Sequence, residues 1–375
     1  MKIKLKICAV CGTRPDTVKM APVINELKKH QDKAEVVLIV TGQHREMLEQ
    51  VIKVFNLNPD YDLDIMTAKQ SLASITTKAL EKLDVILEKE EPDILLAQGD
   101  TTTTFVASLS AFYRKIPFGH VEAGLRTNNK FDPFPEEINR RITGILADVH
   151  FAPTQLAKEN LLNENISEND IFVTGNTVID ALLTTASQDY KFSNPIYDEI
   201  KKYEKIILLT THRRENWGDK MQQICLAVDE IIKTNKDIAV VFPVHKNPIV
   251  RETVLPILQN KERIFLIEPP DYIEFVHLMK LSNIVLTDSG GVQEEAPSLG
   301  KPVLVLRETT ERPEGVDAGN AKLIGTNKQN IIDQTNNLLN NIEEYDKMAK
   351  ANNPYGDGNS SKKICNIIFD RYYKK

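Results

Sequence analysis

The sequence predicts an α/β protein with two doubly wound parallel sheets. Three observations carry this prediction: 375 residues suffice for two domains, short apolar runs recur along the chain, and segments of helical periodicity separate these runs. Apolar runs of about four to eight residues without strict alternation are typical of strands buried on both faces of a parallel sheet. Repeated strand–helix–strand units then imply right-handed crossovers and Rossmann-like domains.

The first series of predicted strands occupies the amino-terminal half of the chain. Its apolar runs are Ile3–Cys11, Glu35–Thr41, Asp93–Ala97, Phe118–Glu122, His150–Ala152 and Ile171–Thr174. Helical periodicity between these runs is found at Met20–Lys29, Met47–Phe55 and Leu72–Glu88. We therefore predict a first domain that comprises residues 1–174.

The pattern restarts after a polar, turn-rich interval at Gln188–Tyr197. The second series of strands comprises Ile206–Thr210, Ile238–Pro243, Ile264–Ile267, Asn283–Thr287, Pro302–Leu306 and Lys322–Ile324. Predicted helices in this half include Met221–Thr234 and Ile331–Leu339. We expect a second domain of residues 175–359 and a last helix, within 360–375, that returns to the first domain.

Composition and charge exclude several classes of protein. The 41% hydrophobic and 27% charged residues are ordinary for a globular protein, and no apolar stretch approaches the about 18 residues of a membrane span. The amino-terminal segment lacks a cleavage site, so we expect a buried strand there and a cytoplasmic protein. The net charge of −6 argues against nucleic acid as the main partner. Cys8 and Cys11 have C-x-x-C spacing but no second pair, so no zinc or redox site is expected.

Polar residues follow the predicted strands at the positions where open α/β sheets bind ligands. Arg14 lies in the turn after the first strand, with Lys19 about one helical turn later. These two cations either contact a phosphate or sugar or are simply solvated. Asp100 follows the strand at 93–97, where it either faces a ligand or caps the next helix.

Two further carboxylates follow in the first domain. Alternation along the strand places His120 and Glu122 on one face, and a carboxylate at a buried strand end is costly unless it is paired or functional. Glu136 opens a later helix, where the helix dipole also favours an acidic residue. Together with Asp100, these groups could divide acid and base roles if their environments separate their pKa values.

The second domain carries residues suited to an anionic ligand. His212 is followed by two arginines at a strand end, which indicates an anion site. Ser289, Gly290 and Gly291 connect a strand to a helix, so their backbone N–H groups suit a pyrophosphate. Glu295 follows one helical turn later, where it could bind ribose hydroxyls. The alternative interpretation of this segment is a glycine turn with a helix cap. Neither a G-x-G-x-x-G motif after the first strand nor a Walker A motif is present, which disfavours NAD and ATP and leaves a nucleotide-sugar as a candidate ligand.

Several segments, spread over nearly the whole chain, occur in the order expected of one known family. They are GTRPDTVKMAP, TGQHREML, QGDTTTT, HVEAGLRT, PFPEEINRRITG, VTGNTVIDAL, THRRENWG, TDSGGVQEEAPSLGKPVLVLRETTERPEG and NPYGDG. Together they resemble the non-hydrolysing UDP-N-acetylglucosamine 2-epimerases. The resemblance implies a GT-B architecture, in which two Rossmann-like domains face a cleft, and a homodimer.

The resemblance also implies an activity. Enzymes of this kind interconvert UDP-GlcNAc and UDP-ManNAc reversibly, without a metal or a nicotinamide cofactor. Elimination of UDP would give 2-acetamidoglucal, and protonation on the opposite face of C2 with re-addition of UDP would give the epimer. The product would supply ManNAc units for cell-surface polysaccharide.

Particular residues match the functional positions of this family. Asp100, Glu122 and Glu136 match its catalytic carboxylates, with the choice between base and acid left open, and His212 matches its active-site histidine. The substrate-binding positions are Arg14, Lys19, Pro270, Phe275, Ser289, Gly290, Gly291, Glu295 and Arg312. The segment that contains Pro270 and Phe275 would receive the uracil.

Some bacterial members also bind UDP-GlcNAc at a second, activating site. Gln43 and His44 match residues of that site, and Lys69 occupies a further position of it. Glu46 and Lys69 depart from the Gln and Arg often found there, so regulation follows less directly than catalysis.

Three other activities fit parts of the same pattern. A UDP-sugar glycosyltransferase would share the nucleotide-binding half but need an acceptor groove, and a non-catalytic sensor would bind UDP without turnover. A hydrolysing relative would release free ManNAc and UDP. The combination of Asp100, Glu122 and Glu136 favours the epimerase over the transferase.

Overall fold

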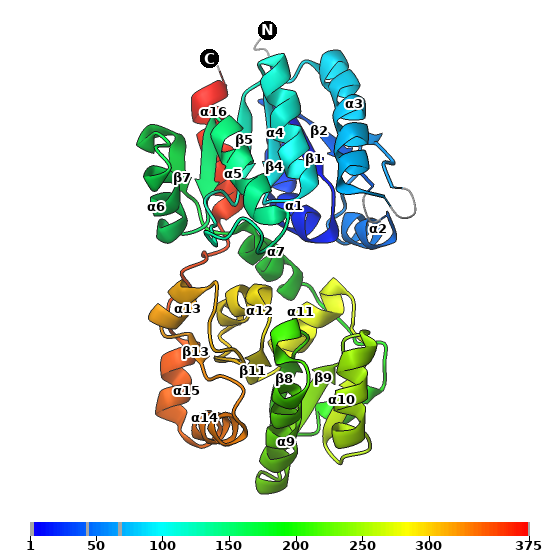
Figure 1. The fold of residues 1–375 in the computed structure, drawn as a ribbon, viewed down its shortest axis with the longest axis vertical. Helices are drawn as coiled ribbons and strands as arrows, with labels where there is room; N and C mark the ends of the chain where they lie inside the picture. Colours follow the sequence, from blue (N-terminus) through cyan, green and yellow to red (C-terminus); the bar gives the residue numbers. More distant parts are fainter. Residues whose placement is uncertain (1–3, 43–44, 67–69, 374–375) are drawn as a thin grey trace. The chain divides into compact units, whose positions relative to one another are not determined.

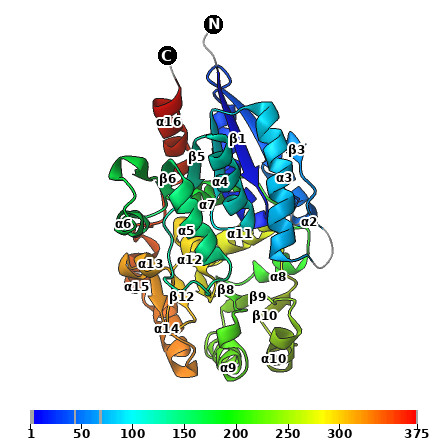
Figure 2. The ribbon, with the colours of Figure 1, turned by 45° about the horizontal axis from the view of Figure 1, so that its top comes forward.

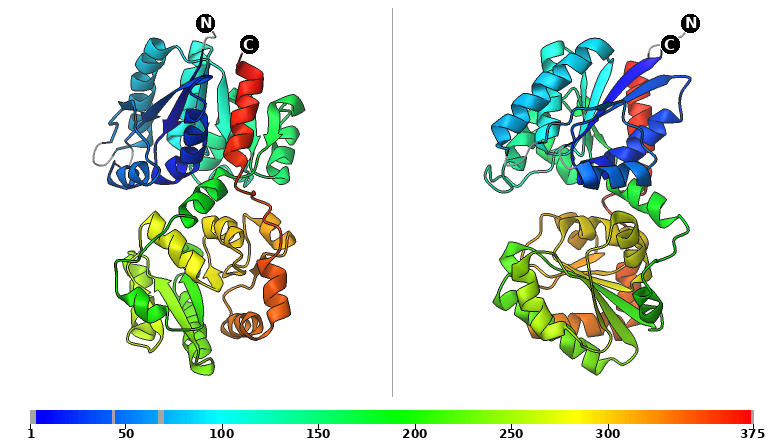
Figure 3. Two further views of the ribbon diagram at one scale, coloured as in Figure 1. Left: turned by 180° about the vertical axis from the view of Figure 1, so that it is seen from behind. Right: turned by 90° about the vertical axis from the view of Figure 1, so that its right-hand side faces the viewer.

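The computed structural model describes residues 4–42, 45–66 and 70–373. The chain divides into two compact units, which we call unit 1 (Met1–Ala181 with Tyr355–Lys375) and unit 2 (Leu182–Pro354). The division falls within helix α7 (Thr177–Ala186), shortly after the expected boundary at residue 174. Each unit is a parallel sheet with helices on both faces, so the predicted α/β fold with two doubly wound sheets is confirmed (Figures 1 and 3).

Unit 1 has a seven-stranded sheet in the order β3-β2-β1-β4-β5-β6-β7, in which all neighbouring strands are parallel. The strands are β1 (Leu5–Cys11), β2 (Ala34–Val40), β3 (Tyr61–Asp62), β4 (Ile94–Gln98), β5 (Phe118–Val121), β6 (Val149–Ala152) and β7 (Ile171–Val173). The strand order reverses at β1 and β4, and ligands of open α/β sheets bind at such a switch point. The predicted strands of this half are confirmed, whereas the short edge strand β3 was not predicted.

The helices of unit 1 cover both faces of this sheet (Figures 2 and 3). They are α1 (Arg14–Lys28), α2 (Arg45–Val54), α3 (Leu72–Glu90), α4 (Thr102–Arg114), α5 (Glu136–Leu146), α6 (Gln155–Asn163), the start of α7, and α16 (Ser360–Tyr372). Helix α16 packs beside α1. The buried carboxylate of Asp180 fixes its start, because it accepts hydrogen bonds from the amides of Ser360 (3.2 Å) and Ser361 (2.8 Å).

Unit 2 has a six-stranded parallel sheet in the order β10-β9-β8-β11-β12-β13. Its strands are β8 (Lys205–Thr210), β9 (Ile238–Pro243), β10 (Ile264–Ile267), β11 (Ile284–Thr287), β12 (Val303–Val305) and β13 (Ala321–Leu323). Its helices are α8 (Ile196–Ile200), α9 (Asp219–Thr234), α10 (Pro248–Leu258), α11 (Tyr272–Leu281), α12 (Gly290–Glu295), α13 (Pro313–Asp317), α14 (Lys328–Asn340) and α15 (Ile342–Ala349). The order again reverses between two central strands, β8 and β11.

Alternating strand residues form the cores of both units. In unit 2, Ile207, Val240 and Phe242 are fully buried beneath α9. In unit 1, Val10 and Leu95 pack in the same way against α3 and α4. Burial of one such side chain stabilises the fold by roughly 1.5–3 kcal/mol, so these apolar layers hold the strand ends rigidly. Within the part of the chain that the structure describes, no helix has the length and apolar character needed to span a membrane.

Candidate functional site

The polar residues predicted for unit 1 lie after strands that are neighbours in the sheet. β1, β4 and β5 are adjacent and parallel, so the segments that follow them emerge at one edge. Gly99 and Glu122 adopt left-handed backbone conformations, with φ of 77° and 62°, and each ends the extended path of its strand. The alternation rule that placed His120 and Glu122 on one face is therefore wrong for Glu122, because β5 ends at Val121.

Glu122 is a nearly buried carboxylate with two donors on one oxygen. Its Oε2 accepts hydrogen bonds from Lys19 Nζ and Gln98 Nε2, each at 2.5 Å. The side chains of Lys19 and Glu122 are 19% and 6% exposed, so the ion pair is largely shielded from water. A buried carboxylate is stable in this setting because both a charge and a hydrogen-bond donor compensate for its lost hydration.

Asp100 is held by a buried arginine of α5. Arg140 Nη2 donates to the Asp100 carboxylate, and Asn139 Nδ2 donates to the Asp100 carbonyl at 3.0 Å. The other guanidinium nitrogen, Arg140 Nη1, donates to Glu137. The residue that caps α4 is Thr101, so the interpretation of Asp100 as a helix cap is wrong, and its carboxylate is instead paired with a cation.

The acidic pair at the start of α5 divides into a structural and an available carboxylate. Glu137 is fully buried and accepts hydrogen bonds from the Thr127 amide (3.0 Å), the Asn128 amide (3.3 Å) and Arg141 Nε (3.0 Å). Burial would raise the pKa of Glu137, but these donors hold it below its usual range. Glu136 is half-buried, and its carboxylate has no hydrogen-bond partner among the described residues.

Two further groups complete the edge of unit 1. His120 Nε2 lies 2.7 Å from the Gly99 carbonyl oxygen, and burial lowers the pKa of His120 to about 3. The imidazole is therefore neutral at pH 7 and anchors the turn that carries Asp100. Arg14 begins α1 as a half-buried residue, and its guanidinium has no ion-pair partner within the described ranges. An anionic ligand could supply that partner.

A buried aspartate organises the corresponding edge of unit 2. Asp288 follows β11 and is fully buried. Its Oδ2 accepts hydrogen bonds from Thr211 Oγ1 (2.8 Å), the amides of His212 and Arg213 (2.9 Å each) and Asn216 Nδ2 (3.0 Å). These donors all lie in the segment from Thr211 to Asn216, which follows β8, the neighbouring strand. Asp288 therefore fixes the loop that carries His212.

The His212 imidazole contacts Asp288 and His245 and is also partly exposed to solvent. Its Nδ1 lies 3.4 Å from Asp288 Oδ1, and its ring stacks on His245 with centroids 5.4 Å apart. Burial lowers the pKa of His212, although the Asp288 carboxylate acts in the opposite direction. The side chain is nevertheless 40% exposed, so a neutral imidazole is presented to a ligand.

The Arg213 guanidinium lies beside the loop after β11. Ser289 is the residue before α12, and the first N–H groups of a helix have no intrahelical acceptor. A Cβ at Gly290 would lie 3.8 Å from Arg213 Nη2, whereas one at Gly291 would meet open space. Glu295 is the half-buried last residue of α12. This arrangement is suited to a diphosphate.

The remaining predicted residues of unit 2 are Arg312, Pro270 and Phe275, which lie near the starts of α13 and α11. Arg312 precedes α13, and its Nε donates to the buried Glu294. Pro270 is half-buried in the loop after β10, and Phe275 packs partly exposed against the core of unit 2. Pro270 precedes α11 and Phe275 lies in its first turn, so both present apolar surface near the start of this helix.

Some of the predicted groups lie outside the described residues or form no site. Gln43, His44 and Lys69 are outside the described residues. All four cysteines are buried free thiols, and burial raises the pKa of Cys8 to about 12, so it is an unreactive thiol. Among the described residues no cluster of three His, Cys, Asp or Glu side chains could hold a metal ion.

Sequence reasoning missed the residues that support the predicted ones. Gln98, Arg140 and Asp288 lie within segments that were recognised, yet none was given a role. Their positions at strand ends, or one helical turn from an acidic residue, were visible in the sequence. Which carboxylate each would contact depends on the sheet order and was not visible.

Comparison with known proteins places the chain among sugar-nucleotide epimerases. The family model described as UDP-N-acetylglucosamine 2-epimerase matches residues 25–369. A UDP-N-acetylglucosamine 2-epimerase of Bacillus subtilis is 53% identical over 373 residues, which are 99% of this chain and 97% of the relative. One from Escherichia coli is 50% identical, covering 97% of this chain and 98% of the relative.

Solved structures show the same relationship. A UDP-GlcNAc 2-epimerase from Neisseria meningitidis, solved with UDP-GlcNAc bound, has a TM-score of 0.85 at 49% identity and covers 98% of this chain and 100% of that chain. A glycotransferase of kitacinnamycin has a TM-score of 0.66 at 11% identity, which is a likeness of fold alone.

Proposed function

The chain belongs to the UDP-N-acetylglucosamine 2-epimerase family, and from this premise we propose that it interconverts UDP-GlcNAc and UDP-ManNAc by eliminating and re-adding UDP. The structural observation that carries the proposal is the set of carboxylates at one edge of the unit 1 sheet. Glu122 is paired with Lys19, Asp100 is paired with Arg140, and Glu136 is unpaired among the described residues. Their environments differ, which is the condition for separate acid and base roles.

The chemistry requires such groups. The C2–H of the sugar has no adjacent carbonyl, so direct removal of its proton would be far too slow. Cleavage of the C1–O bond, with its electron pair leaving on UDP, builds positive charge at C1 and makes the C2 proton acidic. A base removes that proton, a C1=C2 double bond forms, and 2-acetamidoglucal and UDP result. A second group protonates C2 on the opposite face while UDP adds back to C1.

In this proposal the two units divide the work. The carboxylates of unit 1 transfer the protons, and Arg14 and Lys19 supply positive charge. The Ser289 side chain, the amides of Gly290 and Gly291, and His212 stabilise the charge of the leaving diphosphate in unit 2. Glu295 and Arg312 contact the ribose and the substrate, and Pro270 with Phe275 receives the uracil. The enzyme would act in the cytoplasm, and its product would supply ManNAc units for cell-surface polysaccharide.

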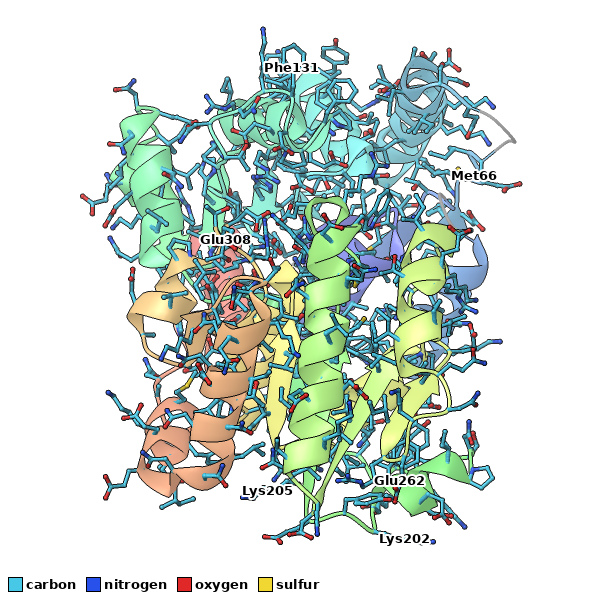
Figure 4. The ribbon with its side chains drawn as sticks, turned by 60° about the horizontal axis from the view of Figure 1, so that its bottom comes forward. Met66, Phe131, Lys202, Lys205, Glu262 and Glu308 are labelled. Carbon is cyan, nitrogen blue, oxygen red and sulfur yellow. The ribbon has the colours of Figure 1, made fainter. Side chains whose placement is uncertain are left out.

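We also propose that the protein forms a homodimer through one face of unit 1. Helix α4 packs against both α3 and α5 on this face (Figure 2). The exposed apolar side chains there are Leu72, Val85, Phe112, Tyr113, Phe131, Phe134, Ile138 and Ile145. Phe131 lies at the outside of the unit in Figure 4. Exposed apolar groups on three adjacent helices and in the segment before α5 are typical of a surface that another protein covers. A second copy is the partner implied by the family.

Sedimentation tests the dimer. Ile145 on α5 is 74% exposed, and Ile342 on α15 of unit 2 is 69% exposed. We expect the unmodified chain and an Ile342→Glu variant to sediment as dimers, and an Ile145→Glu variant to dissociate because a charge would be buried at the contact. A dimer unaffected by Ile145→Glu would contradict the assignment of this face.

Product analysis tests the activity. The protein is incubated with UDP-GlcNAc in deuterated water, and the products are followed by NMR. An epimerase gives UDP-ManNAc with deuterium at C2. Free ManNAc with UDP would instead indicate the hydrolysing reaction, and an unchanged C2–H would indicate a transferase or a sensor.

A further inference from the structure

The two hydrogen bonds to Glu122 fall on the same oxygen atom. Lys19 and Gln98 both donate to Oε2, and Oε1 accepts no hydrogen bond within the part of the chain that the structure describes. Resting on the proposed function, we propose that Gln98 is a positioning residue: it fixes the plane of the Glu122 carboxylate so that Oε1 alone exchanges a proton with C2 of the sugar.

The position of Gln98 is itself tightly fixed. It is the last residue of β4, only 4% exposed, and it pairs with Val121 in the register between β4 and β5. Its carbonyl oxygen accepts a hydrogen bond from Thr104 Oγ1 at 2.6 Å. The strand end therefore holds the amide at a constant distance from Glu122, the residue that follows Val121.

Lys19 cannot provide the same constraint. Its ammonium group sits at the end of a flexible four-carbon chain and acts as a point charge, so it can follow the carboxylate as the carboxylate rotates. Glu122 also has a left-handed backbone, an uncommon conformation for a residue other than glycine. A second donor from a rigid strand removes the remaining rotation. An amide N–H does not release its proton near neutral pH, so Gln98 orients Glu122 without competing for the proton.

Substitutions of Gln98 separate positioning from folding. Gln98→Met keeps the size of the side chain and removes the donor, so Oε2 keeps only Lys19. We expect the rate of deuterium exchange at C2 to fall about 10- to 100-fold, because small misplacements of a reacting group carry losses of that order. KM and the Kd for UDP should remain within about twofold, since the donor acts on Glu122 and not on the nucleotide.

The pH dependence of exchange in Gln98→Glu is a second measurement, and a purely structural role of Gln98 would not change it. Near pH 8 two carboxylates face each other across the Lys19 ammonium group, and exchange should fall at least as far as in Gln98→Met. As the pH is lowered toward 6, the pair can share a proton, the new carboxyl group can donate to Oε2, and the ratio to the wild-type rate should rise. The ratio for Gln98→Met should stay constant over the same range.

A substitution at another buried polar residue of unit 1 serves as a control for a general loss of stability. Ser110 is fully buried and donates to the Val106 carbonyl within α4, so Ser110→Ala should lower the Tm while leaving exchange within about twofold. The proposal is overturned if Gln98→Met exchanges deuterium at the wild-type rate, if Gln98→Glu does not recover at lower pH, or if Ser110→Ala loses exchange to the same degree. Absence of exchange in the wild-type protein would overturn the proposed function instead.

Discussion

Replacing Asp288 with asparagine should loosen the loop that carries His212 and weaken the binding of UDP. The Asp288 carboxylate accepts four hydrogen bonds of 2.8–3.0 Å on one oxygen. A hydrogen bond to a charged group contributes about 1.5–3 kcal/mol and one to a neutral group about 0.5–1.5 kcal/mol, so each bond weakens by about 1 kcal/mol. Bonds in one network are not additive, and we therefore expect a total loss of about 2–4 kcal/mol in the free energy of unfolding.

Chemical denaturation and titration calorimetry with UDP measure the two effects. We expect the Kd for UDP to rise at least about tenfold, because Arg213 and His212 depend on the same carboxylate. Asp346→Asn is the matched control. Asp346 is a half-buried residue of α15 whose side chain is 43% exposed and pairs with Lys350, so the loss of its charge should change stability by less than about 0.5 kcal/mol. Wild-type stability and UDP affinity in Asp288→Asn would refute the reasoning.

Two further predictions concern residues of unit 1. Burial lowers the pKa of His150 to about 4 from an ordinary 6.5. The unfolded chain therefore binds more protons than the folded chain below pH 6.5, and the stability contributed by the neutral imidazole is lost as the pH falls toward 4. At pH 5 the free energy of unfolding is lower by about 2 kcal/mol for this reason. Between pH 7.5 and pH 5, the free energy of unfolding of His150→Gln, measured by urea titration, should therefore fall by about 2 kcal/mol less than that of wild type. An equal fall in the two proteins would contradict the burial argument. Arg14→Gln should raise KM about tenfold and leave the free energy of unfolding within about 0.5 kcal/mol of the wild-type value, because no described group pairs with Arg14. A large loss of stability would show a structural role instead.

Most of the fold followed from the periodicity of the sequence. The apolar runs at 206–210 and 238–243 are long and uninterrupted, and they appear as β8 and β9 with nearly the same ends. β3 escaped prediction because two residues at a sheet edge leave no apolar run. The predicted strand at 118–122 was one residue too long, since the left-handed conformation of Glu122 is set by its tertiary surroundings rather than by its residue type.

The positions of the candidate site residues at strand ends could be predicted from the sequence, but the contacts between these residues could not. Residues at strand ends, such as Asp100 and Ser289, could be located because parallel sheets bind ligands there. The partners of these residues come from distant segments: Arg140 reaches Asp100 across 40 positions, and Gln98 reaches Glu122 across 24. Such pairs depend on which strands become neighbours, and local sequence does not contain that order.

The most direct test of the account compares UDP binding with proton exchange at C2 in a Glu122→Gln variant. We expect the Kd for UDP to stay within about threefold of wild type, because the groups proposed to bind the nucleotide belong to unit 2. We also expect deuterium incorporation from deuterated water to fall by at least about a thousandfold, since an amide cannot take the proton. Exchange at a rate near that of wild type would contradict the assignment of proton transfer to the carboxylates of unit 1.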